Sequence, residues 1–237
     1  FQELTGYTNN ELIGNNHSLM KSSKNAPDFF QHFWKKLLEE NKFNGKIWNQ
    51  RKDKDNALHS VTITTISLDK TYYLSTHIDI TEEAALQERN LYLAYHDPHT
   101  GLANRSLFED RLSNVIYNAV RFGSSVVIVY CALNEFKQIN DDFGHATGDY
   151  VLIEIAKRLK SHFRTNDTVS RFGGDEFVIL VEHLEDNTQL LKIVEGLKNK
   201  IKAPIGDLSL CVSTSIGTAC FPQDGLTKEQ LLLIADD

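Results

Sequence analysis

The chain has 237 residues, of which 41% are hydrophobic and 24% are charged, and its formal net charge is −7 at pH 7. This length suits one large domain or two modest ones, and the composition is that of a globular protein rather than a disordered one. The negative charge argues against binding to nucleic-acid polymers and against attraction to acidic membrane surfaces.

The cysteines and the apolar runs bear on the cellular compartment. Cys131, Cys211 and Cys220 form no CxxC pair, so we expect reduced core thiols rather than a disulfide framework or a zinc site. The longest apolar run, 126–133, is too short to cross a bilayer, and no targeting segment is present. Because the chain begins and ends in mid-pattern, we expect a piece of a longer protein. We therefore expect cytoplasmic domains, and membrane attachment through missing segments stays open.

Residues 1–80 predict short helices followed by strands. Asn10–Gly14 predicts a short helix that ends at its glycine. Apolar residues at helical spacing after Pro27 predict a second helix that runs through Leu38. Three strand-like runs follow, at 45–52, 58–68 and 71–80.

Several stretches of this first part resemble the PAS family of sensor domains. They are Phe1–Tyr7 with Glu11–Gly14, then Gly45–Asp53, then Asp79–Glu82. In order, they resemble the family's opening helices, its central strand and turn, and the closing motif that couples such a domain to an output helix. The resemblance implies an antiparallel sheet with flanking helices over residues 1–80, and the family's first strand is missing before Phe1.

The ligand of such a sensor stays open. The 15–17 segment, Trp34 and the 49–52 run resemble flavin-binding relatives. No cysteine occurs in residues 1–80, which disfavours a flavin–cysteinyl photosensor. Trp34 also suits a core position on the apolar face of its helix, and His17 is a poor haem ligand without supporting context. We expect a pocket that is empty or holds a small metabolite.

Residues 81–95 are rich in Glu, Ala, Leu and Gln and predict a helix. Thr81, followed by two glutamates, suits the start of that helix. Its apolar residues form only a thin stripe: Ala85, Leu86, Leu93 and Ala94. A solvated linker would have a similar composition, but the position favours a helix that couples the first part to the second.

Residues 96–237 alternate between helical and strand patterns. Helices are predicted at 106–122, 149–163, 188–201 and from 228 onward, and strands at 124–133, 167–183 (a hairpin) and 208–221. This mixture predicts an α+β or α/β fold with a mainly antiparallel central sheet surrounded by helices.

The most informative stretch is Arg171–Phe177, with the sequence RFGGDEF. Two glycines directly precede two carboxylates at the predicted tip of a hairpin. Glycine lets a backbone approach a ligand closely, and adjacent acids hold divalent metal beside phosphates. Taken alone, Gly-Gly-Asp is also ordinary turn chemistry.

Further motifs occur in order around this hairpin, and the set resembles the GGDEF family, the diguanylate cyclases. They are His96–Asp97 with Thr100–Arg105, then Phe136–Asp141, then Gly144–His145 with Gly148–Asp149, then Ser215–Gly217. His99 stands where the family usually has leucine. The resemblance implies a palm-like domain over 96–237 whose C-terminal end is cut off.

The resemblance implies that two GTP molecules, held by a homodimer with Mg²⁺ or Mn²⁺, are joined into cyclic di-GMP. It assigns GTP binding to Lys137, Asn140, His145, Asp149, Gly173 and Gly174. It assigns metal binding and catalysis to Asp175 and Glu176, with the backbone carbonyl of Leu133 as a further metal ligand. Asparagine and aspartate can pair with the guanine edge, although these residue types also suit helix caps and turns.

One metal position departs from the family pattern. The family places an aspartate five residues before the lysine of Phe-Lys and a second acid three residues before it; here these are Ala132 and Asn134, counted from Lys137. Mg²⁺ requires oxygen ligands, which a methyl group cannot supply. We therefore expect metal binding to be weak and cyclase activity to be low or absent.

A separate motif, Arg164-Thr165-Asn166-Asp167, resembles the family's RxxD product-inhibition site. Five residues separate it from Gly173, as that pattern requires. Arginine can hydrogen-bond to guanine and stack on it. The same spacing also occurs in ordinary surface pairs, but its register with the hairpin favours a cyclic di-GMP site.

Together these patterns predict a PAS-regulated GGDEF domain that senses GTP or cyclic di-GMP, or regulates a following domain. The sequences of residues 96–97 and 107–112 also resemble GGDEF domains that precede an EAL phosphodiesterase domain. Two alternatives stay open: an active diguanylate cyclase, and an interaction module that dimerises through the 81–95 helix and binds no nucleotide.

Overall fold

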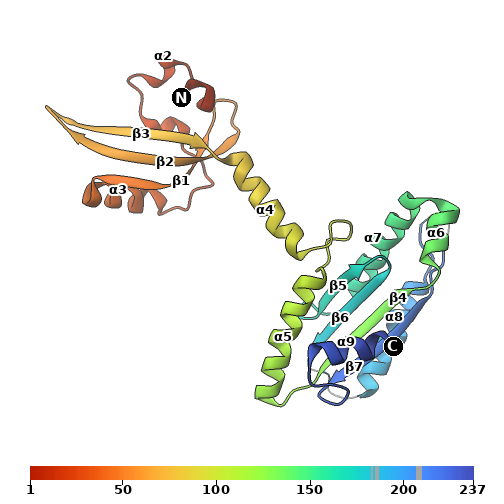
Figure 1. Cartoon of the computed structure of the whole chain (residues 1–237). Coiled ribbons are helices and arrows are strands. Elements are labelled where there is room, and N and C mark those ends of the chain that lie inside the picture. The colour runs from red at the N-terminus through yellow and green to blue at the C-terminus, as the bar shows by residue number, and fades with distance from the viewer. Residues whose placement is uncertain (183, 185–186, 207–209) are drawn as a thin grey trace. The chain divides into compact units, whose positions relative to one another are not determined.

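The computed structural model describes residues 1–182, 184, 187–206 and 210–237. It divides into two compact units, Phe1–Asn90 and Leu91–Asp237 (Figure 1). Helix α4 (Thr81–Tyr95) contains the boundary between them, and none of its residues is buried. Its bounds are those that the sequence predicts.

The N-terminal unit is a three-stranded antiparallel sheet packed against one long helix. The strands are β1 (Lys42–Gln50), β2 (Asn56–Ser67) and β3 (Thr71–Asp79), in the order β1-β2-β3. Helix α3 (Phe29–Glu40) buries Phe33 and Leu37 against the sheet. The shorter elements are α1 (Gln2–Thr5), α2 (Asn9–Leu12) and the 3-10 turn η1 (His17–Met20). The helices and strands predicted for this part are thus present, with ends shifted by a few residues.

Asp79 fixes the point where β3 passes into α4. Its carboxylate accepts hydrogen bonds from the Arg51 guanidinium at 2.6 Å and from the Thr81 backbone N–H at 2.9 Å. The Thr81 hydroxyl donates to the same carboxylate and accepts the Leu58 N–H at 2.9 Å. Burial would raise the pKa of Asp79, but the Thr81 and Arg51 donors outweigh it and lower the pKa. The helix therefore starts at a defined residue.

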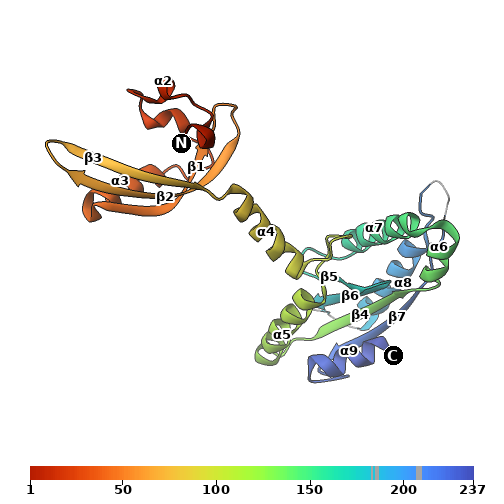
Figure 2. The ribbon, with the colours of Figure 1, turned by 45° about the horizontal axis from the view of Figure 1, so that its top comes forward.

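The C-terminal unit is built on a four-stranded, fully antiparallel sheet. Its strands are β5 (Thr168–Gly173), β6 (Glu176–Glu182), β4 (Val126–Leu133) and β7 (Thr214–Phe221), in that spatial order. Helices α5 (Arg105–Phe122) and α9 (Lys228–Asp236) cover one face, and α7 (His145–His162) and α8 (Asn187–Lys202) cover the other (Figure 2).

Strand β4 is buried on both faces of the sheet, which explains its unbroken apolar run. Val126 and Ile128 pack with α5 and α9, while Val127 and Val129 pack with α7 and α8. The strand predicted over 124–133 is thus confirmed, with its start two residues later.

Two elements differ from the sequence expectation. Helix α6 (Phe136–Phe143) was not predicted, because it is short and because its N-cap is Glu135, which has a φ of +57° and makes no side-chain capping hydrogen bond. The strand expected over 208–221 begins only at Thr214. Parts of that strand and of the predicted hairpin, 208–209 and 183, lie outside the described residues.

The side chain of Asn25 forms hydrogen bonds with the backbone of the edge strand β1, and their contribution to stability can be tested. Its side-chain amide donates to the Trp48 carbonyl at 2.8 Å, and its amide oxygen accepts the Trp48 N–H at 3.0 Å. We expect Asn25→Ala to destabilise the N-terminal unit by roughly 2 kcal/mol, because two backbone groups lose their partner. Urea unfolding followed by tryptophan fluorescence measures this, since the two tryptophans, Trp34 and Trp48, both lie in this unit. Asn44→Ala, at an exposed position of β1, is the control; an equal shift for both variants would contradict the assignment.

Candidate functional site

The candidate site lies at the tip of the β5–β6 hairpin. The two strands pair out of regular register between Arg171 and Gly173, and Gly174 adopts a φ of +50°, which favours glycine. The Leu133 N–H, at the end of β4, donates to the Asp175 carbonyl at 3.1 Å. The hairpin tip is thereby joined to the end of the central strand.

A buried ion pair holds the tip in place. The Arg171 guanidinium contacts the Asp97 carboxylate at 3.1 and 3.2 Å and donates to the Gly174 carbonyl at 2.6 and 3.1 Å. Asp97 also accepts from the Thr100 N–H at 2.8 Å and from its hydroxyl at 2.6 Å. Burial opposes ionisation of Asp97, but the Thr100 and Arg171 donors prevail and lower its pKa. One arginine thus ties the start of the unit to the hairpin backbone.

Glu176 faces a methyl group where the family has a carboxylate. In the sheet, Ala132 stands opposite Glu176 on β6 and opposite Ser215 on β7. Residues opposite one another project from the same face, so Glu176 and Ala132 share the face covered by α5 and α9. Burial, and then the charge of Glu176, raise the pKa of the Tyr130 phenol on that face. Within the sheet, Glu176 therefore stands opposite a methyl group and near a phenol, and its charge also helps to raise the pKa of the Arg105 guanidinium.

The two residues that follow strand β4, Asn134 and Glu135, do not place a carboxylate opposite Glu176. The Asn134 amide donates to the Ser213 hydroxyl at 3.0 Å and accepts from the Ser215 hydroxyl at 2.9 Å. Glu135 is exposed, because strand β4 ends at Leu133 and α6 begins beyond it. No group of three or more His, Cys, Asp or Glu residues suited to a metal occurs among the described residues.

The residues assigned to guanine lie on α6 and α7. Asn140 packs so closely on Gly148 that a Cβ added there would lie 1.9 Å from the Asn140 amide oxygen. The next residue, Asp149, is half-exposed, and its carboxylate lies 3.9 Å from Nδ1 of His99. The structure thus brings Asn140 and Gly148 together, and it places the unusual histidine beside Asp149. Lys137 and His145 are exposed near the starts of α6 and α7.

Arg164 and Asp167 form a local turn between α7 and β5. The Asp167 carboxylate accepts the Arg164 backbone N–H at 2.9 Å. Both residues line two adjacent cavities of about 270 and 330 Å³. The larger one is also lined by Arg111 and Lys160, so three cationic side chains and one carboxylate surround it.

Sequence reasoning missed the partners of several site residues. Asp97 and Arg171 both belong to motifs, but they are 74 positions apart, and the sequence around each gave no sign that they pair. The proximity of Tyr130 to Glu176 follows from strand register, which the sequence did not predict. His99 gave a signal, as a departure from the family pattern, although its neighbour Asp149 was not foreseen.

Comparison with known proteins identifies the family. Residues 94–237, more than half of the chain, match the family model described as diguanylate cyclase, GGDEF domain. The chain therefore belongs to the GGDEF family, and the resemblance found in its motifs is confirmed.

The relatives are longer signalling proteins. MucR of Pseudomonas aeruginosa, described as a bifunctional diguanylate cyclase/cyclic di-GMP phosphodiesterase, is 36% identical over 182 residues, which cover 76% of this chain and 26% of MucR. Signaling protein YkoW of Bacillus subtilis is 30% identical over 247 residues, covering 95% of this chain and 30% of YkoW. The structure of the GGDEF domain of TpbB from P. aeruginosa is 37% identical with a TM-score of 0.57, covering 60% of this chain and 84% of that one. This chain thus spans less than a third of the length of MucR or YkoW.

No helix in the described ranges combines the length and the apolar character that crossing a membrane requires.

The ion pair at the hairpin can be tested directly. We expect Arg171→Met to destabilise the C-terminal unit by about 3 kcal/mol, because Asp97 is left buried without its cation. Since the pKa of Asp97 is lowered in the folded state, the wild type should lose this stabilisation as the pH falls below the ordinary value of 3.8. Denaturation followed by far-UV circular dichroism measures both effects. Arg121→Met, at an exposed position of α5, is the control, and equal stability of Arg171→Met and wild type would refute the role.

Proposed function

We propose that the chain is part of a cyclic di-GMP signalling protein. In this proposal a PAS-type N-terminal unit controls, through α4, a GGDEF domain that binds nucleotide but catalyses poorly. The observation that carries the second half is the pairing of Ala132 with Glu176 across the sheet.

In this proposal, the missing negative charge at residue 132 limits catalysis. Joining two nucleotides requires metal ions to neutralise the phosphates and to position the attacking hydroxyl. An aspartate at 132 would stand directly opposite Glu176, and two such carboxylates would hold a cation between them. With alanine there, Glu176 and Asp175 act alone, and the Leu133 carbonyl is a weak substitute. Binding of GTP or cyclic di-GMP then becomes the main role.

Two features support nucleotide binding. Asn140 and Asp149 provide an amide and a carboxylate that suit the guanine edge, and Gly148 keeps the amide in its place. Around Arg164, three cations suit the phosphates of cyclic di-GMP, while Asp167 suits its guanine.

The whole protein would act through partners outside this chain. MucR is described as both a diguanylate cyclase and a cyclic di-GMP phosphodiesterase, and this supports a following EAL domain that the GGDEF unit regulates. The exposed Leu86, Leu91 and Leu93 on α4 support a homodimer formed through that helix. A full-length sequence of this protein without EAL motifs would rule out the proposed EAL domain.

An active diguanylate cyclase is the second candidate. The observation in its favour is the ordered hairpin, with Asp175 joined to β4 and Arg171 holding Gly174. This candidate makes Ala132 a tolerated change rather than a disabling one.

An Ala132→Asp variant separates the two. In the untruncated protein with GTP and Mg²⁺ or Mn²⁺, we expect wild type to form little cyclic di-GMP and Ala132→Asp to raise the rate at least tenfold, because the carboxylate pair is restored. Ala132→Asn, which has the same size without the charge, is the matched control and should stay near wild type. Strong product formation by wild type, barely raised by Ala132→Asp, would establish the active cyclase instead.

Gly148 provides a test of the guanine site that does not depend on turnover. A Cβ at Gly148 would displace the Asn140 amide, so we expect Gly148→Ala to weaken GTP binding about tenfold, the loss of one hydrogen-bonded contact. Calorimetric titration with GTP measures the affinity. Gly196→Ala on α8, whose Cβ would meet only the His162 imidazole, is the control. Unchanged affinity in Gly148→Ala would remove Asn140 from the site, and absence of both GTP and cyclic di-GMP binding in wild type would favour the interaction module.

A further inference from the structure

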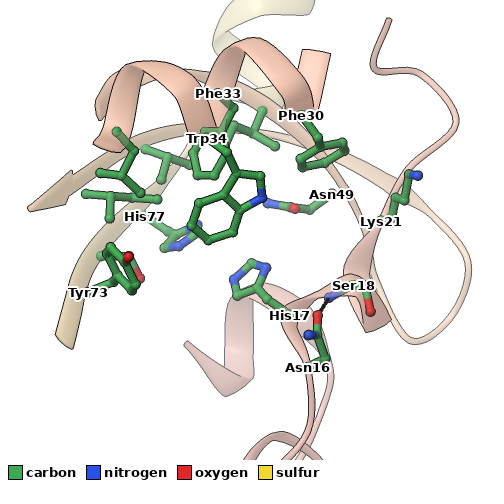
Figure 3. A pocket seen from close by; sticks show the side chains of 15 residues that line it. Asn16, His17, Ser18, Lys21, Phe30, Phe33, Trp34, Asn49, Tyr73 and His77 are labelled. Carbon is green, nitrogen blue, oxygen red and sulfur yellow. Dashed lines mark hydrogen bonds between the residues drawn. The ribbon is translucent and has the colours of Figure 1, made fainter. Parts of the chain in front are cut away.

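The N-terminal unit contains a cavity of about 420 Å³ between α3, the η1 segment and one face of the sheet (Figure 3). This volume lies in the range of pockets that bind small molecules. Strand register places the lining residues of the sheet on one face, since Val61 on β2 stands opposite His77 on β3 and Ile63 stands opposite Ser75. The cavity is therefore a product of the sheet's inner face and is separate from the nucleotide site.

One side of this cavity is apolar and rich in aromatic rings. Helix α3 contributes Phe30, Phe33 and Trp34, and the sheet contributes aliphatic side chains. The expectation that Trp34 is a core residue is wrong: its side chain is 47% exposed, and its indole lines the cavity. An exposed tryptophan beside an apolar hollow supplies a flat surface on which a planar ring can stack.

The other side of the cavity is lined by His17 and His77, and His59 lies directly beside His77. Neither ring nitrogen of His77 has a hydrogen-bond partner, although both are shielded from water. Beside it, His59 takes a hydrogen bond from Asn49 at 3.0 Å on one nitrogen, and its other nitrogen is also buried and unpartnered. His17 stacks on His77 with ring centroids 5.7 Å apart. Buried polar groups left unpaired cost free energy, and a bound ligand would supply the missing partner.

The charge of the lining points to an acid. Lys21 is the only formally charged side chain among the lining residues, which include no carboxylate. Among the described residues Lys21 makes no ion pair, and its ammonium lies 5.6 Å from the centre of the Phe30 ring. Burial, and then the neighbouring His17 and His59, lower the pKa of His77 to about 4, so it is a neutral donor at pH 7. A cation and neutral imidazoles suit an anion better than they suit a cation.

We propose that this cavity binds a planar aromatic molecule bearing an acidic group. The ring lies against Trp34 and the phenylalanines of α3, and the acidic group faces Lys21 and the histidines. The proposal gives the ligand class for the proposed sensor role. It rests on the N-terminal unit alone, so its failure and a failure of nucleotide binding are separate results.

Three naphthalene probes of one shape and different charge test the ligand class. They are 2-naphthoate, 2-naphthamide and 2-naphthylmethylammonium, titrated into the full chain by calorimetry at pH 7. We expect 2-naphthoate to bind at least tenfold more tightly than the amide, and the ammonium probe to bind most weakly. Equal or tighter binding of the amide or the ammonium probe, or no binding of any probe, overturns the proposal.

Matched variants test the residues. Lys21→Gln should weaken 2-naphthoate at least fivefold and leave 2-naphthamide unchanged, while Lys36→Gln, a lysine on α3 outside the cavity, should change neither. His77→Phe should reduce the preference for the acid over the amide, and His32→Phe, an exposed histidine on α3, should not. Tryptophan fluorescence confirms that each variant is folded. If His77→Phe does not fold, the result for the surface variant Lys21→Gln tests the proposal. Identical naphthoate affinities for Lys21→Gln and Lys36→Gln would show that the cation plays no part and would overturn the assignment.

Discussion

The C-terminal unit depends on one buried ion pair. Arg171 uses its guanidinium both to neutralise Asp97 and to hold the Gly174 carbonyl. A hairpin tip with two glycines has few contacts of its own, and a fixed arginine supplies the rigidity that its backbone lacks. The positions of Asp175 and Glu176, and their distance from the end of β4, follow from this constraint. Removing either partner would leave a charge in a poorly solvated place.

The same scaffold explains why a single small side chain matters. Cross-strand pairing puts residue 132 opposite Glu176, so the charge of that one residue decides whether two carboxylates face each other. With alanine there the sheet is intact, because the backbone of Ala132 still pairs with Glu176 on β6 and with Ser215 on β7. In the proposed function, the fold persists while the metal chemistry weakens, and the residues proposed to bind guanine lie on other elements, α6 and α7.

The two units use buried polarity in opposite ways. In the C-terminal unit the buried charges of Asp97 and Arg171 are fully paired, which gives a rigid structure. In the N-terminal unit His77 lines a cavity, and His77 and its neighbour His59 have buried ring nitrogens without a hydrogen-bond partner, which supports the proposed ligand site. Buried polar groups that are fully hydrogen-bonded stabilise a rigid scaffold, whereas unpaired ones can accept or donate hydrogen bonds to a ligand.

The sequence alone determined the family and much of the fold. Motifs at fixed spacing located the hairpin, the apolar residues within 124–133 predicted a buried strand, and counting back from Lys137 revealed Ala132. These features are local, so short stretches carry them. Only the tertiary structure decided which distant residues meet: Asp97 with Arg171, His99 with Asp149, and Ala132 with Glu176. It also showed that α6 is a separate helix, that Trp34 lines a cavity, and that His17, His59 and His77 gather in one place. Such contacts depend on strand register and on the path of the chain, and the sequence next to each residue does not indicate which distant residue it will meet.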